Sequence, residues 1–415
     1  MSYLRRRLVT AALTANALRP PTSSRAGMVA FIPGTLTGEF APHLLAATAA
    51  DTVVSIARGK ASKPSVAVAA ATMAGLGYLI ASSVRARTVL DQSLTDGLGA
   101  DYVERLDHLP TPAEMTTPWA SLINPFDWRD KRVQVERNVA YSEAGTRGHL
   151  DIYRPAGRDL VDAPVLLQVH GGGWTTGEKD HQSIPLMKHL AAQGWVCVAI
   201  NYRLAKKHPF PAQVIDVKRA IVWIKENIGE YGGDPSYLAI TGGSAGAHLA
   251  SLAALTPGDP DFQPGFEDAD TSVQAAIPHY GTYDFAGATE LPRAIYARDT
   301  FFGPLVLHRR WADSPEAFEA ASPILRITPD APDFFVIHGA NDTMAPAAEA
   351  RLFVERLRET SKRSVVYAEL PVAQHAFDVF PSIRSVHVFR AVERYLNWHW
   401  NSTKHPHLVE EVLDR

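Results

Sequence analysis

From residue 133 onwards, short apolar runs alternate with segments whose apolar residues recur at helical spacing. Residues 165–170 and 195–202 are almost continuously apolar, which is typical of strands buried on both faces of a sheet. Residues 212–228 instead repeat apolar side chains every three or four positions, as one face of a helix does. By the same reasoning, six further segments are predicted to be strands: residues 133–141, 149–153, 237–241, 273–278, 334–338 and 365–370.

This alternation predicts an α/β domain over residues 133–415, with a mostly parallel sheet and helices on both faces. Residues 91–132 are more polar and contain several prolines, so we expect a connector there. Residues 1–90 differ from the rest of the chain because they are both basic and apolar. We expect them to form a separate helical N-terminal region.

The charge pattern of the N-terminal region suggests contact with a membrane. Residues 1–64 contain eight lysines and arginines but only two acids, Glu39 and Asp51, whereas the whole chain has a net charge of −3. Residues 65–84 then carry no charge, over about the length that a helix needs to cross a bilayer. We therefore expect a membrane-associated or cell-envelope protein, attached through residues 26–84.

Two other interpretations of this region remain. The helices could instead form a cap or an oligomer interface in a soluble, cytoplasmic protein. Arg5, Arg6 and Arg7 followed by apolar residues 8–18 also have the shape of a signal peptide. A cut after Ala17 would leave a very short apolar core, which argues against cleavage.

Composition excludes some classes of protein. Hydrophobic residues make up 46% of the chain and charged residues 20%, which are ordinary values for a globular protein. The small net charge argues against a general nucleic-acid binder, so we expect no nucleic-acid partner. Cys197 is the single cysteine, so there is neither an intrachain disulfide nor a cysteine-based zinc site.

The strand predicted at residues 237–241 leads directly into Gly242-Gly243-Ser244-Ala245-Gly246 and an alanine-rich helix. A Gly-x-Ser-x-Gly sequence between strand and helix is the nucleophile elbow of a serine hydrolase. Gly242 and Gly246 remove side chains that would collide with backbone at the tight turn. Ser244 is therefore the predicted nucleophile.

A glycine loop follows the strand at 165–170. Its sequence is His170-Gly171-Gly172-Gly173-Trp174. Acyl transfer creates negative charge on a carbonyl oxygen, and small residues let backbone N–H groups approach that oxygen. We predict an oxyanion hole made by the N–H groups of Gly172, Gly173 and Ala245.

The acid and the base should follow Ser244 in that order, at the carboxyl ends of later strands. Asp342 follows the strand at 334–338, and His375 follows the strand at 365–370. We predict Asp342 as the acid and His375 as the base. The competing candidates fit these positions less well; they are Asp284, Asp330 and Asp378 for the acid and His248 for the base.

These motifs together resemble the hormone-sensitive-lipase-like branch of the α/β-hydrolases, over residues 133–400. Further matching segments are Tyr202-Arg203-Leu204, Gly232-Gly233-Asp234-Pro235 and His375-Ala376-Phe377. The layout with a basic, apolar N-terminal region is similar to mycobacterial and other actinobacterial esterases. The resemblance implies the α/β-hydrolase fold and cofactor-free, metal-free hydrolysis of short- to medium-chain esters. Two positions depart from the family pattern. One is Gly243, directly before the nucleophile, where many members carry Asp, and the other is Lys206-Lys207.

The hypothesis is thus a serine carboxylic-ester hydrolase that works through an acyl-enzyme on a small-molecule or lipid ester. An arylformamidase-like amide hydrolase and a catalytically silent ligand-binding module are the alternatives. We expect a chain that begins near residue 100 to gain solubility and to keep its activity on small esters. The chain could also form an oligomer.

Overall fold

The computed structural model describes residues 1–106, 110–120, 122–126 and 128–404. Its centre is an eight-stranded sheet in the order β1-β2-β4-β3-β5-β6-β7-β8. β2 runs antiparallel to both of its neighbours, β1 and β4, and the strands β3 to β8 all run parallel to one another. The predicted α/β class and all eight predicted strands are confirmed. The strands are β1 (Val133–Ala140), β2 (His149–Pro155), β3 (Ala163–Val169), β4 (Val196–Ile200), β5 (Gly233–Gly243), β6 (Ala275–His279), β7 (Asp333–Gly339) and β8 (Val365–Leu370).

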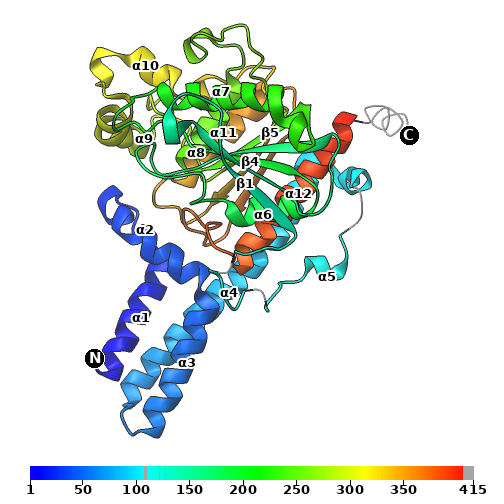
Figure 1. Cartoon of the computed structure of the whole chain (residues 1–415). Coiled ribbons are helices and arrows are strands. Elements are labelled where there is room, and N and C mark those ends of the chain that lie inside the picture. Colours follow the sequence, from blue (N-terminus) through cyan, green and yellow to red (C-terminus); the bar gives the residue numbers. More distant parts are fainter. Residues whose placement is uncertain (107–109, 121, 127, 405–415) are drawn as a thin grey trace.

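Helices cover both faces of this sheet (Figure 1). On one face lie α7 (Ala212–Asn227), α8 (Ala245–Leu255) and α11 (Ala347–Thr360). On the other lie α6 (Ile184–Ala192), α12 (Ile383–Lys404) and the second half of α4 (Lys63–Leu98). Shorter helices lie outside these layers, namely α5 (Pro112–Met115), α9 (Pro292–Ala297), α10 (Pro315–Ala320) and the π-helical segment Arg298–Leu307.

The continuously apolar strands are explained by these two layers. Side chains alternate along a strand, so Val165 and Leu167 of β3 enter one buried cluster while Leu166 enters the other. Cys197 in the neighbouring β4 is fully buried in the same way as Leu166. A strand with both faces covered is therefore apolar at most positions, although β3 also buries Gln168.

The described chain begins with the helices α1 (Tyr3–Leu18), α2 (Ser24–Glu39), α3 (Ala41–Ala57) and α4. α1, α3 and the first half of α4 project from the domain as a helical arm, whereas α2 runs back along the domain (Figure 1). Ala17, Ala41, Leu76 and Leu79 form a small buried cluster where these helices meet.

α4 belongs to both parts of the molecule. It begins with a capping box between Ser62 and Ser65 and ends at Gly99, whose φ is 90°. It crosses the predicted boundary at residue 90 without a break, and Leu90 and Leu94 are fully buried against the sheet. By length and composition, α4 could cross a membrane, and the bent pair α2–α3 could do so only with a 78° break.

Candidate active site

Ser244 lies in the tight turn between β5 and α8, with φ 58° and ψ −119°. The flanking glycines are required by the packing around this turn. A Cβ on Gly242 would lie 2.5 Å from the backbone of Gly246, and one on Gly246 would lie 2.0 Å from the carbonyl oxygen of Val169. The turn therefore presents a half-buried serine hydroxyl above the sheet.

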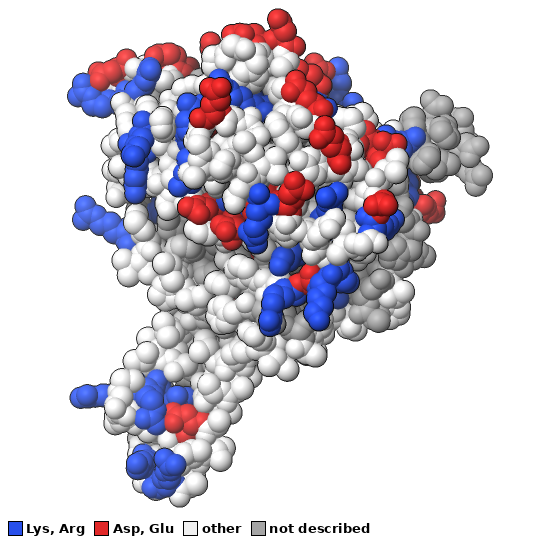
Figure 2. Space-filling view, in the orientation of Figure 1, with Lys and Arg blue, Asp and Glu red and all other residues white. Residues whose placement is uncertain are grey.

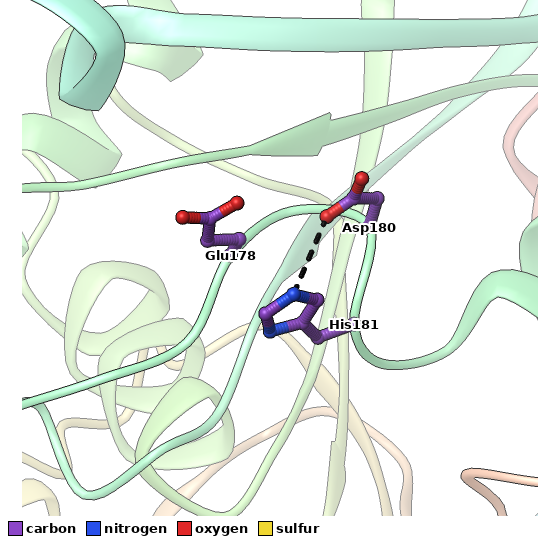
Figure 3. Close-up of side chains that lie close together, drawn as sticks. All are labelled: Glu178, Asp180 and His181. Atoms are coloured by element: carbon purple, nitrogen blue, oxygen red, sulfur yellow. Dashed lines mark ion pairs between the residues drawn. The ribbon is translucent and has the colours of Figure 1, made fainter.

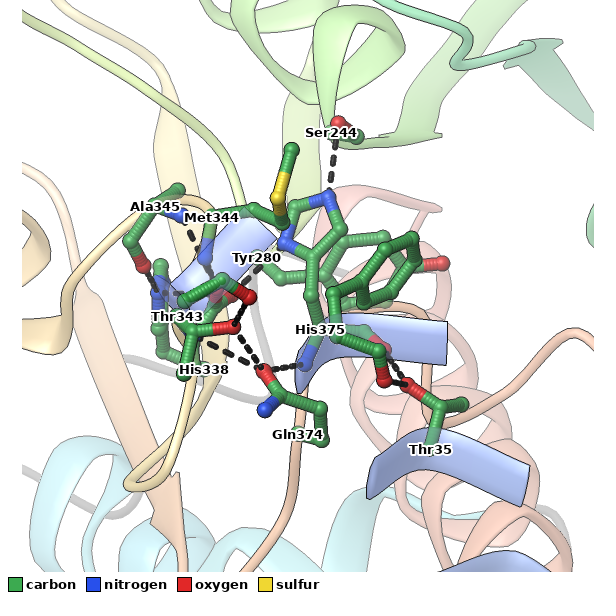
Figure 4. Close-up of polar contacts among 12 residues, drawn as sticks. Thr35, Ser244, Tyr280, His338, Thr343, Met344, Ala345, Gln374 and His375 are labelled. Carbon is green, nitrogen blue, oxygen red and sulfur yellow. Dashed lines mark hydrogen bonds and ion pairs between the residues drawn. The ribbon is translucent and has the colours of Figure 1, made fainter. Parts of the chain in front are cut away.

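The structure brings Ser244 and His375 together (Figure 4), and Asp342 contacts the other side of the His375 ring. Nε2 of His375 lies 2.8 Å from Oγ of Ser244, and Nδ1 lies 2.7 Å from Oδ2 of Asp342. The three residues follow the parallel strands β5, β8 and β7, whose carboxyl ends meet at one edge of the sheet. With the proton on Nδ1, His375 donates to Asp342 and can accept from the serine hydroxyl.

Asp342 is held as a carboxylate by its surroundings. Its Oδ1 accepts hydrogen bonds of 2.8 Å from the backbone N–H groups of Met344 and Ala345. Burial alone would raise the pKa of Asp342, but the imidazoles of His375 and His338 outweigh burial and lower it well below its ordinary value. Sequence reasoning missed His338, which lies at the end of a predicted strand, 3.4 Å from Asp342.

The rival candidates lie elsewhere or have other partners. Asp378 contacts Nδ1 of His279 at 2.6 Å and accepts a hydrogen bond from the Tyr280 hydroxyl. Asp284 caps the backbone N–H groups of residues 287–289, and Asp330 is exposed.

The glycine loop has a conformation that side chains would prevent. Gly172 has φ 119°, and a Cβ there would lie 2.2 Å from the carbonyl oxygen of Thr176. Gly173 has φ 58°. Within the described part of the chain, no group accepts a hydrogen bond from the N–H of Gly172, Gly173 or Ala245. These three donors are therefore free to bind a substrate oxygen.

Two buried histidines support the glycine loop. His170 stacks on Tyr202 with 4.2 Å between ring centroids, and burial lowers the pKa of His170 to about 3. His248 accepts a hydrogen bond from Nε1 of Trp174 at 3.2 Å and lies 2.7 Å from the carbonyl of Ala321. Burial lowers the pKa of His248 to about 4, so this ring is neutral and supports Trp174.

Gly243, which departs from the aspartate that the family resemblance implies for many members, has a structural reason to carry no side chain. A Cβ at this position would lie 2.6 Å from the hydroxyl oxygen of Tyr280. The Tyr280 ring fills that space and packs against His375, with 4.8 Å between ring centroids. In this chain, a tyrosine occupies the place beside the nucleophile that a larger residue at 243 would need.

The N-terminal helix α2 also reaches the site, which sequence reasoning did not anticipate. The ring of Phe31 meets His375 edge-on at 5.5 Å, and the hydroxyl of Thr35 donates to the carbonyl of His375 at 2.9 Å. No local pattern in residues 24–39 indicates these contacts, because their partner lies 340 positions away in the chain.

A second polar group lies on the loop after the glycine motif. The side chains of Glu178, Asp180 and His181 lie close together and are all exposed, with 3.8 Å between Nε2 of His181 and Oδ1 of Asp180 (Figure 3). Exposed acidic groups of this kind are common on protein surfaces. We assign them no role in the chemistry.

The sequence and the fold resemble those of known esterases. The BD-FAE family matches residues 150–357. "Probable carboxylic ester hydrolase LipM" of Mycobacterium tuberculosis is 43% identical over 405 residues, which cover 94% of this chain and 91% of LipM. "Esterase LipQ" of the same organism is 43% identical over 75% of this chain and 74% of LipQ.

Among solved structures, a thermophilic esterase of Thermogutta terrifontis with butyrate bound has a TM-score of 0.52. It is 23% identical and covers 63% of this chain and 91% of its own, so the likeness concerns the fold. The expected α/β-hydrolase fold and the expected likeness to mycobacterial esterases are thus confirmed.

Proposed function

We propose that this chain, a carboxylic ester hydrolase that belongs to the BD-FAE family, cleaves its substrate through an acyl-enzyme on Ser244. The observation that carries the proposal is the continuous contact from Ser244 through His375 to Asp342, at 2.8 Å and 2.7 Å. The free N–H groups of Gly172, Gly173 and Ala245 supply the oxyanion hole.

His375 takes the proton of the Ser244 hydroxyl while the serine Oγ attacks the ester carbonyl. The carbonyl oxygen becomes an oxyanion and is stabilised by the glycine-loop donors. His375 then gives its proton to the leaving alcohol, and a water molecule repeats the cycle on the acyl-enzyme. Asp342 keeps the His375 proton on Nδ1 and stabilises the charged imidazolium.

The substrates that we propose are esters with short to medium acyl chains. LipM and LipQ, to which the chain is similar, are named a carboxylic ester hydrolase and an esterase. An arylformamidase-like activity remains the alternative, because it would use the same serine and the same glycine loop. Rates on p-nitrophenyl esters of increasing chain length, compared with N-formylkynurenine, distinguish the two substrate classes.

Covalent labelling tests the nucleophile directly. A fluorophosphonate should add one phosphonyl group to the parent chain and none to Ser244→Ala, as measured by intact-protein mass. Ser251→Ala, a change to a buried serine on the helix α8 that follows Ser244, is the matched control and should still label. Equal labelling of Ser244→Ala would refute the assignment.

We also propose that the helical arm attaches the enzyme to a membrane. Apolar side chains on the arm are exposed, among them Leu8 (51%), Val53 (66%) and Tyr78 (61%). Arg58, Lys60 and Lys63 are exposed at the turn between α3 and α4. The arm also carries three arginines near the start of α1 (Arg5, Arg6 and Arg7), two of which pair with Asp51, so basic residues outnumber acids on it (Figure 2). An apolar surface with a basic end suits a bilayer that contains anionic lipids.

Sedimentation with vesicles tests this attachment. The parent chain should bind phosphatidylcholine–phosphatidylglycerol vesicles, and Leu8→Glu with Val53→Glu should weaken that binding without changing hydrolysis of a soluble ester. Val161→Glu, at a position 84% exposed on the α/β domain, is the control and should bind like the parent. A full-length chain that neither binds vesicles nor needs detergent would favour a soluble cap or an oligomer interface.

A further inference from the structure

The loop that carries His375 has an unfavourable backbone conformation. Val372 and Ala376, on either side of His375, have φ angles of 56° and 59°. Residues other than glycine rarely adopt this region, because their Cβ crowds the backbone. A loop of this kind keeps its shape only when surrounding groups hold it.

The N-terminal helices supply much of that support. Oγ1 of Thr35 on α2 lies 2.9 Å from the carbonyl oxygen of His375 and 3.1 Å from that of Phe31 in its own helix, so its one proton has the shorter contact with His375; Thr35 is buried (Figure 4). Oγ of Ser82 on α4 donates to the carbonyl of Pro371, also at 2.9 Å. The N-terminal helices therefore hold this loop at two points, namely at its first residue, Pro371, and at the proposed catalytic base, His375.

The same helices hold the loop of the acid. The Asn341 side-chain amide donates to the carbonyls of Ala17 and Leu18 at the end of α1, at 3.1 Å each. The hydroxyl of Thr343 donates to the carbonyl of Gly27 on α2 at 2.9 Å. Two of the three loops in the proposed triad thus rest on residues that lie outside the α/β domain.

We infer that Thr35 is a positioning residue for His375, and that α2 is part of the active site. This inference rests on the proposed role of His375 as the base. Thr35 hydrogen-bonds to the backbone of His375, while Phe31, one turn earlier on α2, meets the imidazole edge-on at 5.5 Å. Together, Thr35 and Phe31 set the position and the orientation of the His375 imidazole relative to Ser244.

Removing the Thr35 hydroxyl should affect the rate more than substrate binding. Thr35→Val keeps the shape of the side chain but leaves the His375 carbonyl without this donor. Misplacing a catalytic group by about 1 Å can cost roughly 100-fold in rate. We expect kcat on p-nitrophenyl butyrate to fall roughly tenfold or more, with KM changed by less than about threefold.

The controls separate positioning from a general loss of structure. Thr72→Val on α4 is matched, because Thr72 is also buried and its hydroxyl donates to the carbonyl of Val68 in its own helix. It should keep kcat. Thr35→Ser should restore kcat, because it keeps the donor. If Thr35→Val does not fold, Thr35→Cys, whose thiol is a weak donor, replaces it with the same expectation.

Full-length protein should be used throughout, with melting temperatures measured in parallel. A Thr35→Val kcat equal to that of Thr72→Val would overturn the inference, and so would a Thr35→Ser variant as slow as Thr35→Val. An active His375→Ala variant would instead refute the proposed function. The two failures are therefore distinguishable.

Discussion

Asp342 and His375 meet at the sheet edge beside Ser244, with 2.7 Å between Oδ2 and Nδ1. Asp378, three positions after His375, is also fully buried, but it contacts His279 and Tyr280. The two aspartates are therefore predicted to differ in what they do. Asp342 orients the base, whereas Asp378 stabilises the strand end that carries Tyr280.

Substitution of each residue of the proposed triad should lower kcat by an amount that depends on the role of that residue. Nucleophile and base act as a unit, so Ser244→Ala and His375→Ala should each lower kcat by roughly 10⁶. Asp342→Asn should lower it by roughly 10⁴, because the amide favours the wrong tautomer of His375. Asp378→Asn and His248→Ala should stay within about tenfold of the parent in kcat while losing stability. Purified-variant kinetics with circular dichroism check this, and a worse kcat for Asp378→Asn than for Asp342→Asn would contradict it.

Gly243→Ala should disturb the site through Tyr280. The new Cβ would lie 2.6 Å from the tyrosine hydroxyl, so the ring must move, and it packs against His375. We expect a loss of roughly 1–3 kcal/mol in stability and a lower kcat. Gly229→Ala is the control, because a Cβ there meets nothing within 4 Å. Denaturant unfolding and kinetics should separate the two variants; equal behaviour would mean that Tyr280 adjusts without cost.

Glu349 on α11 should make stability depend on pH. Burial raises the pKa of Glu349 to about 7, although its carboxylate accepts hydrogen bonds from the N–H groups of Tyr283 and Asp284. A raised folded-state pKa contributes stability that is complete below the ordinary value of 4.5 and is lost as pH rises through about 7.

The Glu349→Gln side chain stays neutral at every pH. The free energy of unfolding of this variant, relative to that of the parent, should therefore rise by roughly 1–3 kcal/mol from pH 5 to pH 8. Urea unfolding at both pH values measures this difference. Glu355→Gln, at an exposed position of the same helix, should show no such gain. A Glu349→Gln effect that does not vary with pH would contradict the prediction.

Removal of the first hundred residues should abolish folding or activity. The structure reverses the expectation that a shortened chain stays active, because Leu90 and Leu94 are fully buried against the sheet. Burying one leucine side chain contributes about 1.5–3 kcal/mol, a large part of the 5–15 kcal/mol that is typical of domain stability. A soluble chain from residue 100 with parent-like fluorophosphonate labelling would contradict this prediction.

The sequence by itself determined the strands, the fold class and the positions of the proposed nucleophile, acid and base. These features depend on local periodicity and on local backbone requirements. A strand covered on both faces is apolar at most positions, as β3 is at Val165–Leu167 and Val169, and a tight turn at Ser244 leaves no space for side chains at Gly242 and Gly246. Chain order and strand ends then placed Asp342 and His375.

Only the tertiary structure decided what packs against these residues. The apolar composition of residues 26–84 indicates surfaces that will be covered, but it does not say whether a membrane or another part of the protein covers them. Thr35 meets a carbonyl 340 positions away, and the second half of α4 joins the core of the α/β domain. Tyr280 occupies the space that Gly243 leaves open. Such contacts join segments that are distant in the chain, so they arise from the packing of whole elements and leave no local pattern to read.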